Sequence, residues 1–345
     1  MGVEQWWEEH RGGLTGYCYR MLGSPFDAED AVQETLVRAW RHADRFDPAK
    51  GSPRNWLYAI ATNVCLDMLR GAERRVLAVD LGPAAEPGAS LGAPLPGERW
   101  VLPVPDAAVI PAGADPAEVA VARETVRLAF VAALQHLPPR QRAVLILRDV
   151  LRWTAAEVAG LLDVTVAAVN SALQRARGAL RAVDPGRAEA FDPLDAGQAR
   201  LLASYCDAFE RHDVERLVAL LAEDATMSMP PFAWWLAGRE HIRRVLSATS
   251  DCAGSRLVPV AANGSPAFAQ YVPAGGGYEP RALVVMDVRD GRIAGTTSFL
   301  DTERLFPLFG LPSAPQGAAE PAGAPGVGAV GGGARRTPRL FGSPR

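Results

Sequence analysis

Residues 154–180 read TAAEVAGLLDVTVAAVNSALQRARGAL, and this segment predicts two helices joined by a very short turn. Only Asp-Val-Thr separates the expected helices over 154–162 and 166–183, and Thr165 is a suitable N-cap for the second. One face of the second helix is apolar at helical spacing, with Val166, Val169, Leu173, Ala176 and Leu180. Two short helices with a tight turn predict a helix-turn-helix.

The other face of the second helix is polar and lacks acidic residues. It carries Asn170, Ser171, Gln174, Arg175, Arg177 and Arg181, and no acid occurs between Val164 and Val183. Asn and Gln can pair with adenine, and Arg can pair with guanine. The alternative is an Arg-rich solvated face, since Lys50 is the only lysine and arginine is abundant throughout the chain. The position of this helix at the end of a four-helix unit favours a nucleic-acid contact.

The composition limits the classes of protein that remain. A chain of 345 residues that is 48% hydrophobic suggests two or three domains with ordinary cores. A net charge of −3 means that any nucleic-acid binding depends on a local patch. The four cysteines lie far apart without a CxxC pair, so neither a zinc site nor a disulfide framework is expected. The N-terminus lacks a signal-peptide core and no long apolar run occurs, so a cytoplasmic protein without membrane spans is expected.

Changes in periodicity divide the chain into six segments. Residues 1–72 and 117–184 predict all-α domains, 198–311 predicts an α+β domain, 73–116 and 185–197 predict linkers (the first flexible), and 312–345 predicts a disordered tail. The helices expected in the second all-α domain span about 117–136, 138–151, 154–162 and 166–183. In the α+β domain a helical stretch over 198–225, with a turn at His212–Asp213, precedes antiparallel strands at 256–262, 267–272, 281–288 and 292–300.

Three longer motifs resemble one protein family. SPFDAEDAVQETLVRAW (24–40) and NWLYAIATNVCLDMLR (55–70) are similar to region 2 of bacterial sigma factors of the extracytoplasmic-function (ECF) type. Residues 137–180 resemble region 4 of the same family, and the absence of region 3 is typical of that group. The resemblance implies that region 2 binds the clamp of RNA polymerase and opens the −10 promoter element. It implies that region 4 binds the polymerase flap and the −35 element.

The resemblance also assigns roles to individual residues. It places Asp30, Gln33 and Glu34 on the clamp, although a capped, solvated helix start would look the same. It places Trp56, Asn63, Asp67 and Arg70 on the −10 element, with Phe46 to Asn55 as the loop that captures a flipped base. Trp56 alternatively belongs to a core face with Ile60, Val64 and Met68. The residues implied at −35 are Asn170, Ser171, Gln174, Arg175 and Arg177. The family often has basic residues at the positions of Asn170 and Ala172, so the −35 contact is expected either to differ in sequence or to be weaker than in the family.

The C-terminal α+β segment resembles a SnoaL-like domain, a cone-shaped barrel of curved antiparallel sheet closed by helices. A subgroup of ECF sigma factors carries this domain, and WVLPVPD (Trp100–Asp106) resembles a linker motif of that subgroup. An apolar cluster in a linker usually packs on a surface, so Trp100, Leu102 and Pro105 are expected to insert into residues 198–311, near Gly275–Gly277. A chance apolar patch is the alternative.

The expected function is that of a sigma factor which directs RNA polymerase to promoters and is modulated in cis by its SnoaL-like domain. The expected partners are the polymerase core, at its clamp and flap, and promoter DNA; a small molecule or regulator at the SnoaL-like domain is a further candidate. No cofactor or metal is expected. The alternative is a SnoaL-type cyclase or isomerase, or a ligand sensor, fused to a DNA-binding module. The titratable candidates for such chemistry are His212, Asp213, Asp224, His241, Asp287 and Asp301, which we interpret as solvated or structural.

Overall fold

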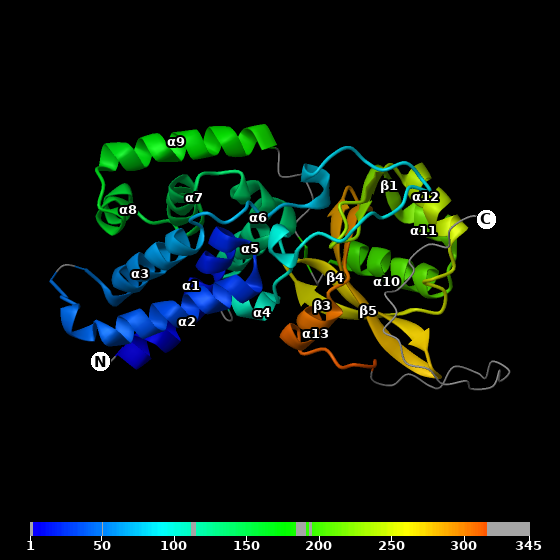
Figure 1. The fold of residues 1–345 in the computed structure, drawn as a ribbon, viewed down its shortest axis with the longest axis horizontal. Coiled ribbons are helices and arrows are strands. Elements are labelled where there is room, and N and C mark those ends of the chain that lie inside the picture. The colour runs from blue at the N-terminus through cyan, green and yellow to red at the C-terminus, as the bar shows by residue number, and fades with distance from the viewer. Residues whose placement is uncertain (1–2, 50, 112–114, 184–190, 193–194, 316–345) are drawn as a thin grey trace. The chain divides into compact units, whose positions relative to one another are not determined.

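The computed structural model describes residues 3–49, 51–111, 115–183, 191–192 and 195–315 (Figure 1). Most of the expected linker 185–197 and, from residue 316 on, the expected tail lie outside these residues. The chain forms two compact units. Unit 1 comprises the described parts of Met1–Leu81, Leu95–Phe191 and Ala261–Ser265, and unit 2 comprises those of Gly82–Pro94, Asp192–Val260 and Pro266–Arg345.

Unit 1 is built from helices (Figure 1). Its described elements are α1 (Val3–Leu22), α2 (Pro25–Arg41), η1 (Ala43–Arg45), α3 (Pro53–Met68), η2 (Ala78–Asp80), η3 (Gly97–Arg99), α4 (Asp106–Val109), α5 (Pro116–Val126), α6 (Leu128–Gln135), α7 (Pro139–Leu145), the π-helical turn η4 (Ile146–Val150), α8 (Ala155–Leu162) and α9 (Val166–Val183). The helix α3 begins where expected, because Pro53 occupies its first turn and the Ser52 side chain accepts from the Asn55 amide. Gly71, in the left-handed region at φ +75°, follows its end.

The buried face of α3 differs from the face that its sequence suggested. Of the expected core residues Trp56, Ile60, Val64 and Met68, only Val64 is fully buried. The buried side chains are instead Leu57, Tyr58, Ala61, Thr62, Val64 and Cys65. Four residues advance an α-helix by about 400°, so a pattern repeated every four residues drifts around the helix by about 40° at each step.

The helix-turn-helix is confirmed. In α8, the Thr154 and Glu157 side chains cap each other's backbone amides, and Asp163 ends the helix in the left-handed region. The Thr165 side chain then accepts from the Ala168 amide at 3.1 Å, which makes it the N-cap of α9 as expected. The single helix expected over 117–136 is broken into α5 and α6, because Arg127 has an extended ψ of 142°.

The segment 73–116, expected to be a flexible linker, is folded onto both units in its described part. Val76 and Trp100 are buried in unit 1 and lie side by side in a parallel bridge. In unit 2, the Ala85 amide donates to the Trp235 carbonyl at 2.8 Å. Proline and glycine give this segment turns in place of periodicity, while Val76, Trp100, Val101, Leu102 and Val104 are still buried.

Unit 2 combines helices with one mixed sheet. Its described elements are α10 (Ala196–Glu210), α11 (Val214–Leu220), β1 (Leu221–Ser228), β2 (Trp235–Ala237), α12 (Arg239–Ala248), β3 (Arg256–Ala262), β4 (Ser265–Ala274), β5 (Gly277–Arg289), β6 (Arg292–Phe299) and α13 (Thr302–Leu308). The strand order is β2-β1-β6-β5-β4-β3. The expected Asp290-Gly291 hairpin joins β5 and β6. The sheet is not purely antiparallel as expected, because β1 pairs with β6 in parallel.

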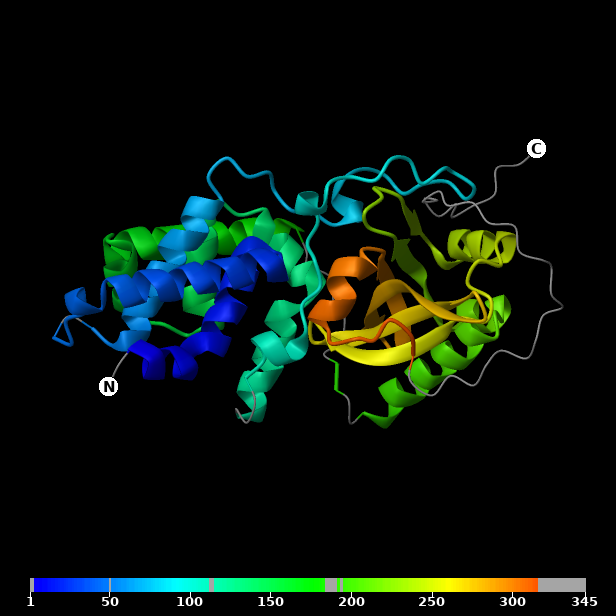
Figure 2. The same cartoon turned by 60° about the horizontal axis from the view of Figure 1, so that its bottom comes forward.

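Helices close the sheet of unit 2 (Figure 2). Tyr205 of α10 stacks on Phe268 of β4, with ring centroids 6.3 Å apart. On β4, Tyr271 meets Phe306 of α13 edge to face at 5.4 Å. The expected turn at His212–Asp213 is confirmed, since His212 has a φ of +55° and separates α10 from α11.

Candidate nucleic-acid interface

The outer face of α9 presents side chains that can form hydrogen bonds. Behind this face, Val169, Leu173 and Ala176 are buried, and α9 packs against α7 and α8. The expected apolar stripe differs at its start, where Val166 is exposed. All five residues expected at the −35 element are exposed: Asn170, Ser171, Gln174, Arg175 and Arg177.

The two arginines of this set are held differently. Arg175 donates from Nη1 to Ser171 Oγ at 2.6 Å and stays on the outer face of α9. Arg177 donates from Nε and Nη2 to the two carboxylate oxygens of Asp149 at 2.8 and 2.6 Å. These hydrogen bonds raise the pKa of Arg177. Arg177 therefore fastens α9 to η4, whereas Arg175 is presented outward.

The outer face of α3 and the turn after it carry three of the four residues expected at the −10 element. Asn63 and Asp67 are exposed and four residues apart, which places them on one face of α3, and the exposed Arg70 lies in the turn just after the helix ends at Met68. Asp67 accepts from Arg70 at 2.9 Å.

Trp56, the fourth residue expected at −10, is half-buried in an aromatic cluster. Its ring centroid lies 5.5 Å from that of Phe46 and 6.4 Å from that of Trp6. The Trp6 and Phe46 rings are 4.6 Å apart. The cluster joins the two ends of the segment Phe46–Asn55 to α1, so Trp56 supports this segment from within unit 1.

An ion-pair network crosses from α2 to α3. Arg38 Nε lies 2.7 Å from Glu34 Oε1, and Arg38 Nη1 lies 3.5 Å from Asp67 Oδ2. Hydrogen bonding to Glu34 is the main cause that raises the pKa of Arg38, and Asp67 adds to it. The network connects a residue expected to bind polymerase with one expected to bind the −10 element.

The exposed face of α2 contains an apolar feature that sequence reasoning missed. Asp30 and Gln33 are exposed, and Glu34 is half-buried. At the helical spacing that follows, Val37 is exposed and Trp40 is 69% exposed. Large aromatic side chains in the open are unusual and often mark an interface. The signal was present in the sequence as the 33-37-40 spacing.

Regions resembling 2 and 4 pack together inside unit 1. Trp153, which precedes α8, is buried against Tyr58 of α3 with ring centroids 5.2 Å apart. The guanidinium of Arg54 lies 4.8 Å from the centroid of the Trp153 ring, which is a cation–π distance. The helix α3 thus contacts the first helix of the helix-turn-helix.

The linker residues expected to insert elsewhere have their partners in unit 1. Trp100 is 1% exposed and lies beside Val76. The Leu102 amide donates to the Gly23 carbonyl at 2.9 Å, and the Tyr19 hydroxyl donates to the Leu102 carbonyl at 2.8 Å.

Pro105 is paired with the segment 261–265. It forms an antiparallel bridge with Ala262, and both residues belong to unit 1. Ala262 lies within the expected range 198–311, so the expected contact is found for Pro105. It is made at this short turn and not at the expected Gly275–Gly277 loop, where nothing lies within 4 Å of the Cβ positions of Gly275 and Gly276. The local signal for the turn is the pair Asn263-Gly264, which is typical of hairpins.

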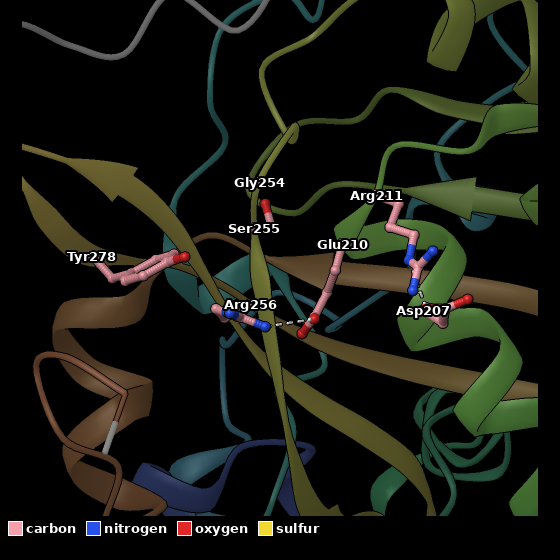
Figure 3. A pocket seen from close by; sticks show the side chains of 7 residues that line it. All are labelled: Asp207, Glu210, Arg211, Gly254, Ser255, Arg256 and Tyr278. Carbon is pink, nitrogen blue, oxygen red and sulfur yellow. Dashed lines mark hydrogen bonds and ion pairs between the residues drawn. The ribbon is translucent and has the colours of Figure 1, made fainter. Parts of the chain in front are cut away.

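A pocket of about 320 Å³ opens on unit 2 (Figure 3). It is lined by Asp207, Glu210, Arg211, Gly254, Ser255, Arg256 and Tyr278. Its charged groups neutralise one another: Arg256 lies 3.0 Å from Glu210, and Arg211 lies 2.8 Å from Asp207. Glu210 also accepts from the Leu257 amide at 3.0 Å.

The six titratable residues considered for catalysis do not line this pocket. Asp213 caps α11 by accepting from the Arg216 amide at 3.1 Å, and Asp224 is paired with Arg289. Across residues 3–315, apart from the undescribed gaps, no cluster of three or more His, Cys, Asp or Glu residues suits a metal ion. In the same part of the chain no single helix is long and apolar enough to cross a membrane.

Three family models match successive parts of the chain. The family described as Sigma-70 region 2 matches residues 6–75, and Sigma-70, region 4 matches residues 127–180. The family described as SnoaL-like domain matches residues 202–296. The helical domains and the helix-turn-helix therefore define an RNA polymerase sigma factor with an added SnoaL-like domain.

Whole-chain relatives give the family more closely. The ECF RNA polymerase sigma factor SigG of Mycobacterium tuberculosis is 46% identical over 314 residues, which cover 88% of this chain and 82% of SigG. SigJ of the same organism is 29% identical over 299 residues, covering 83% and 88%. The crystal structure of SigJ shares the fold, with a TM-score of 0.58 at 23% identity over 89% of this chain and 99% of that one. The chain belongs to the ECF family of sigma factors, which direct RNA polymerase to specific promoters.

Proposed function

We propose that the outer face of α9 binds the −35 element in the major groove, with Asn170, Gln174 and Arg175 directed to base edges. The observation that carries this proposal is an exposed, acid-free polar face on the second helix of a helix-turn-helix. In such motifs the N-terminal half of the second helix contacts bases. Arg177, because it is bound to Asp149, positions α9 on η4.

The test compares two arginines on the same helix. Arg175→Ala removes a base contact worth about 1–3 kcal/mol, so run-off transcription with saturating core polymerase should fall by about 5- to 150-fold at −35-dependent promoters. Arg181→Ala removes the same charge from the last turn of α9 and should leave transcription within twofold of wild type. Equal effects of the two variants would mean that Arg175 contributes only charge.

We further propose that α2 binds the polymerase clamp and that α3 binds and opens the −10 element, while region 4 also meets the flap. Asp30, Gln33, Val37 and Trp40 supply a mixed polar and apolar stripe, which suits a protein interface. On α3, Asn63 and Asp67 are exposed, and the aromatic cluster of Trp6, Phe46 and Trp56 lies at the start of the same helix. Exposed polar groups and aromatic rings are the side chains that receive an unstacked base. The site of action is then the cytoplasm, where polymerase and promoters meet.

For the SnoaL-like domain we propose a regulatory role in cis and no catalysis. The support is that the turn 261–265, which comprises the end of β3, Asn263-Gly264 and the first residue of β4, is part of unit 1. The pocket of unit 2 gives no support to an enzyme or a ligand sensor, because its carboxylates and guanidiniums pair with each other.

A further inference from the structure

Asn263 is a fully buried residue that holds three segments of unit 1. Its φ of +54° lies in the left-handed region, which Asn and Gly tolerate best. The Val104 amide donates to Asn263 Oδ1 at 2.9 Å. Asn263 Nδ2 donates to the Tyr19 hydroxyl and to the Val126 carbonyl, both at 2.7 Å. One side-chain amide thus joins α1, the 95–109 segment and the end of α5.

The next residue, Gly264, is also tightly packed against unit 1. The Gly264 amide donates to Asp106 Oδ1 at 2.7 Å. A Cβ on Gly264 would stand 2.6 Å from the Arg123 carbonyl oxygen, closer than atoms can approach. The space beside Asp106 and Arg123 therefore admits glycine at position 264 and excludes any residue with a side chain there.

Regions 2 and 4, which this turn holds together, lie too close to each other to bind the −10 and −35 elements of one promoter. The helix α3 packs on α8, and α8 packs on α9. At about 10 Å for each helix contact, α3 and α9 lie roughly 20 Å apart. Elements centred at −10 and −35 are about 25 base pairs apart, roughly 85 Å of B-DNA at 3.4 Å per base pair. The arrangement in unit 1 cannot bind both elements at once.

Two arginines are buried where regions 2 and 4 pack together, and both would be rehydrated if the regions separated. The buried Arg20 of α1 donates from Nη2 to Thr125 Oγ1 at 2.8 Å, and the buried Arg142 of α7 donates to the Met21 carbonyl. Burial lowers the pKa of both to about 10. Both guanidiniums are hydrogen-bonded here to neutral oxygens, so rehydration offsets part of the cost of separation. The burial of these two charges thereby lowers the cost of separating the two regions.

We propose that Asn263 is a positioning residue that holds regions 2 and 4 together in a closed form, in which α3 packs on α8. The two regions must separate before the chain can act on a promoter. This inference rests on the proposed function, because it assumes that α3 and α9 bind the two promoter elements. It also gives the regulation in cis a direction: the turn 261–265 restrains the sigma regions, and its release activates them.

The test measures opening and polymerase binding in the full chain. Asn263→Gly keeps the positive φ and the backbone contacts but removes three side-chain hydrogen bonds. Tyr19→Phe removes one hydroxyl, and Ser265→Ala is the control, since Ser265 Oγ donates only within the turn, to the Asn263 carbonyl at 3.3 Å. Dyes on His42→Cys and Arg181→Cys, in a Cys206→Ser/Cys252→Ser background, report the separation of α2 and α9 by energy transfer. Anisotropy reports affinity for core polymerase.

The expected result is a shift of the closed-to-open ratio by about 10- to 100-fold in Asn263→Gly and by about 3- to 10-fold in Tyr19→Phe. Core affinity should tighten in the same order, and Ser265→Ala should match wild type. An unchanged dye separation in both Asn263→Gly and Tyr19→Phe, with intact helical signal, overturns the proposal, as does opening without tighter core binding. Failure of the wild-type chain to start transcription with core would refute the proposed function instead, because dye separation in the free chain does not depend on it.

Discussion

Gly264→Ala tests whether the space between Gly264 and Arg123 is as small as the structure indicates. Gly264 has a φ of +58° and Gly275 has a φ of +56°, so alanine at either position incurs a similar backbone cost of about 1–2 kcal/mol. At Gly275 nothing lies within 4 Å of the new Cβ, whereas at Gly264 the Arg123 carbonyl oxygen lies 2.6 Å from it. The Gly264 backbone must therefore move, and its hydrogen bond to Asp106 is lost.

That hydrogen bond has a charged acceptor, so its loss adds about 1.5–3 kcal/mol at Gly264 alone. The closed form should then be disfavoured by a further factor of about 10 to 150 relative to Gly275→Ala. Hydrogen exchange of the peptide that contains the Val104 amide is the direct assay, because this amide donates to Asn263. Exchange should accelerate by that factor in Gly264→Ala and stay near wild type in Gly275→Ala. Equal acceleration in both variants would refute the steric reasoning.

Two further predictions concern α2 and Asp106. Trp40→Ala should weaken core binding by about 10-fold or more without lowering the unfolding midpoint, whereas Val79→Ala, an exposed apolar residue elsewhere in unit 1, should change neither quantity in titration and melting experiments. Burial raises the pKa of Asp106 above its ordinary value of 3.8, so the native state binds this proton more tightly than the unfolded state does. The stabilisation of the native state by protonated Asp106 is therefore lost as the pH rises from 3.8 through the raised pKa. Asp106→Asn retains an acceptor for Gly264 and should remove that loss in melts at stepped pH, and a profile identical to wild type would contradict the assignment.

Local signals predicted the helix boundaries well. Ser52 and Pro53 start α3, and Thr165 starts α9, because capping depends on residues within one turn. The choice of buried face on α3 was less predictable, since α1, α2 and α8 all pack against this helix and their positions are not written in its own sequence.

Non-local pairing explains what the sequence could not predict. Leu221–Ala225 is rich in residues that favour helices, yet it begins β1, because its partners in β6 lie about seventy residues away. Asn263 is equally instructive: the Asn-Gly pair predicts a turn, but the Tyr19 hydroxyl that it binds is 244 residues distant in sequence. The same separation explains why the expected linker contact was placed at the wrong loop.

Initiation across a promoter library, reconstituted from purified core polymerase and the full-length chain, tests directly whether this chain selects promoters for RNA polymerase. Sequencing of the transcripts should yield a set of promoters that share two motifs at fixed spacing, one melted at −10 and one duplex at −35. Arg175→Ala should relax base preference at a single position of the upstream motif only. Transcripts no more specific than those of core polymerase alone would show that the chain does not select promoters.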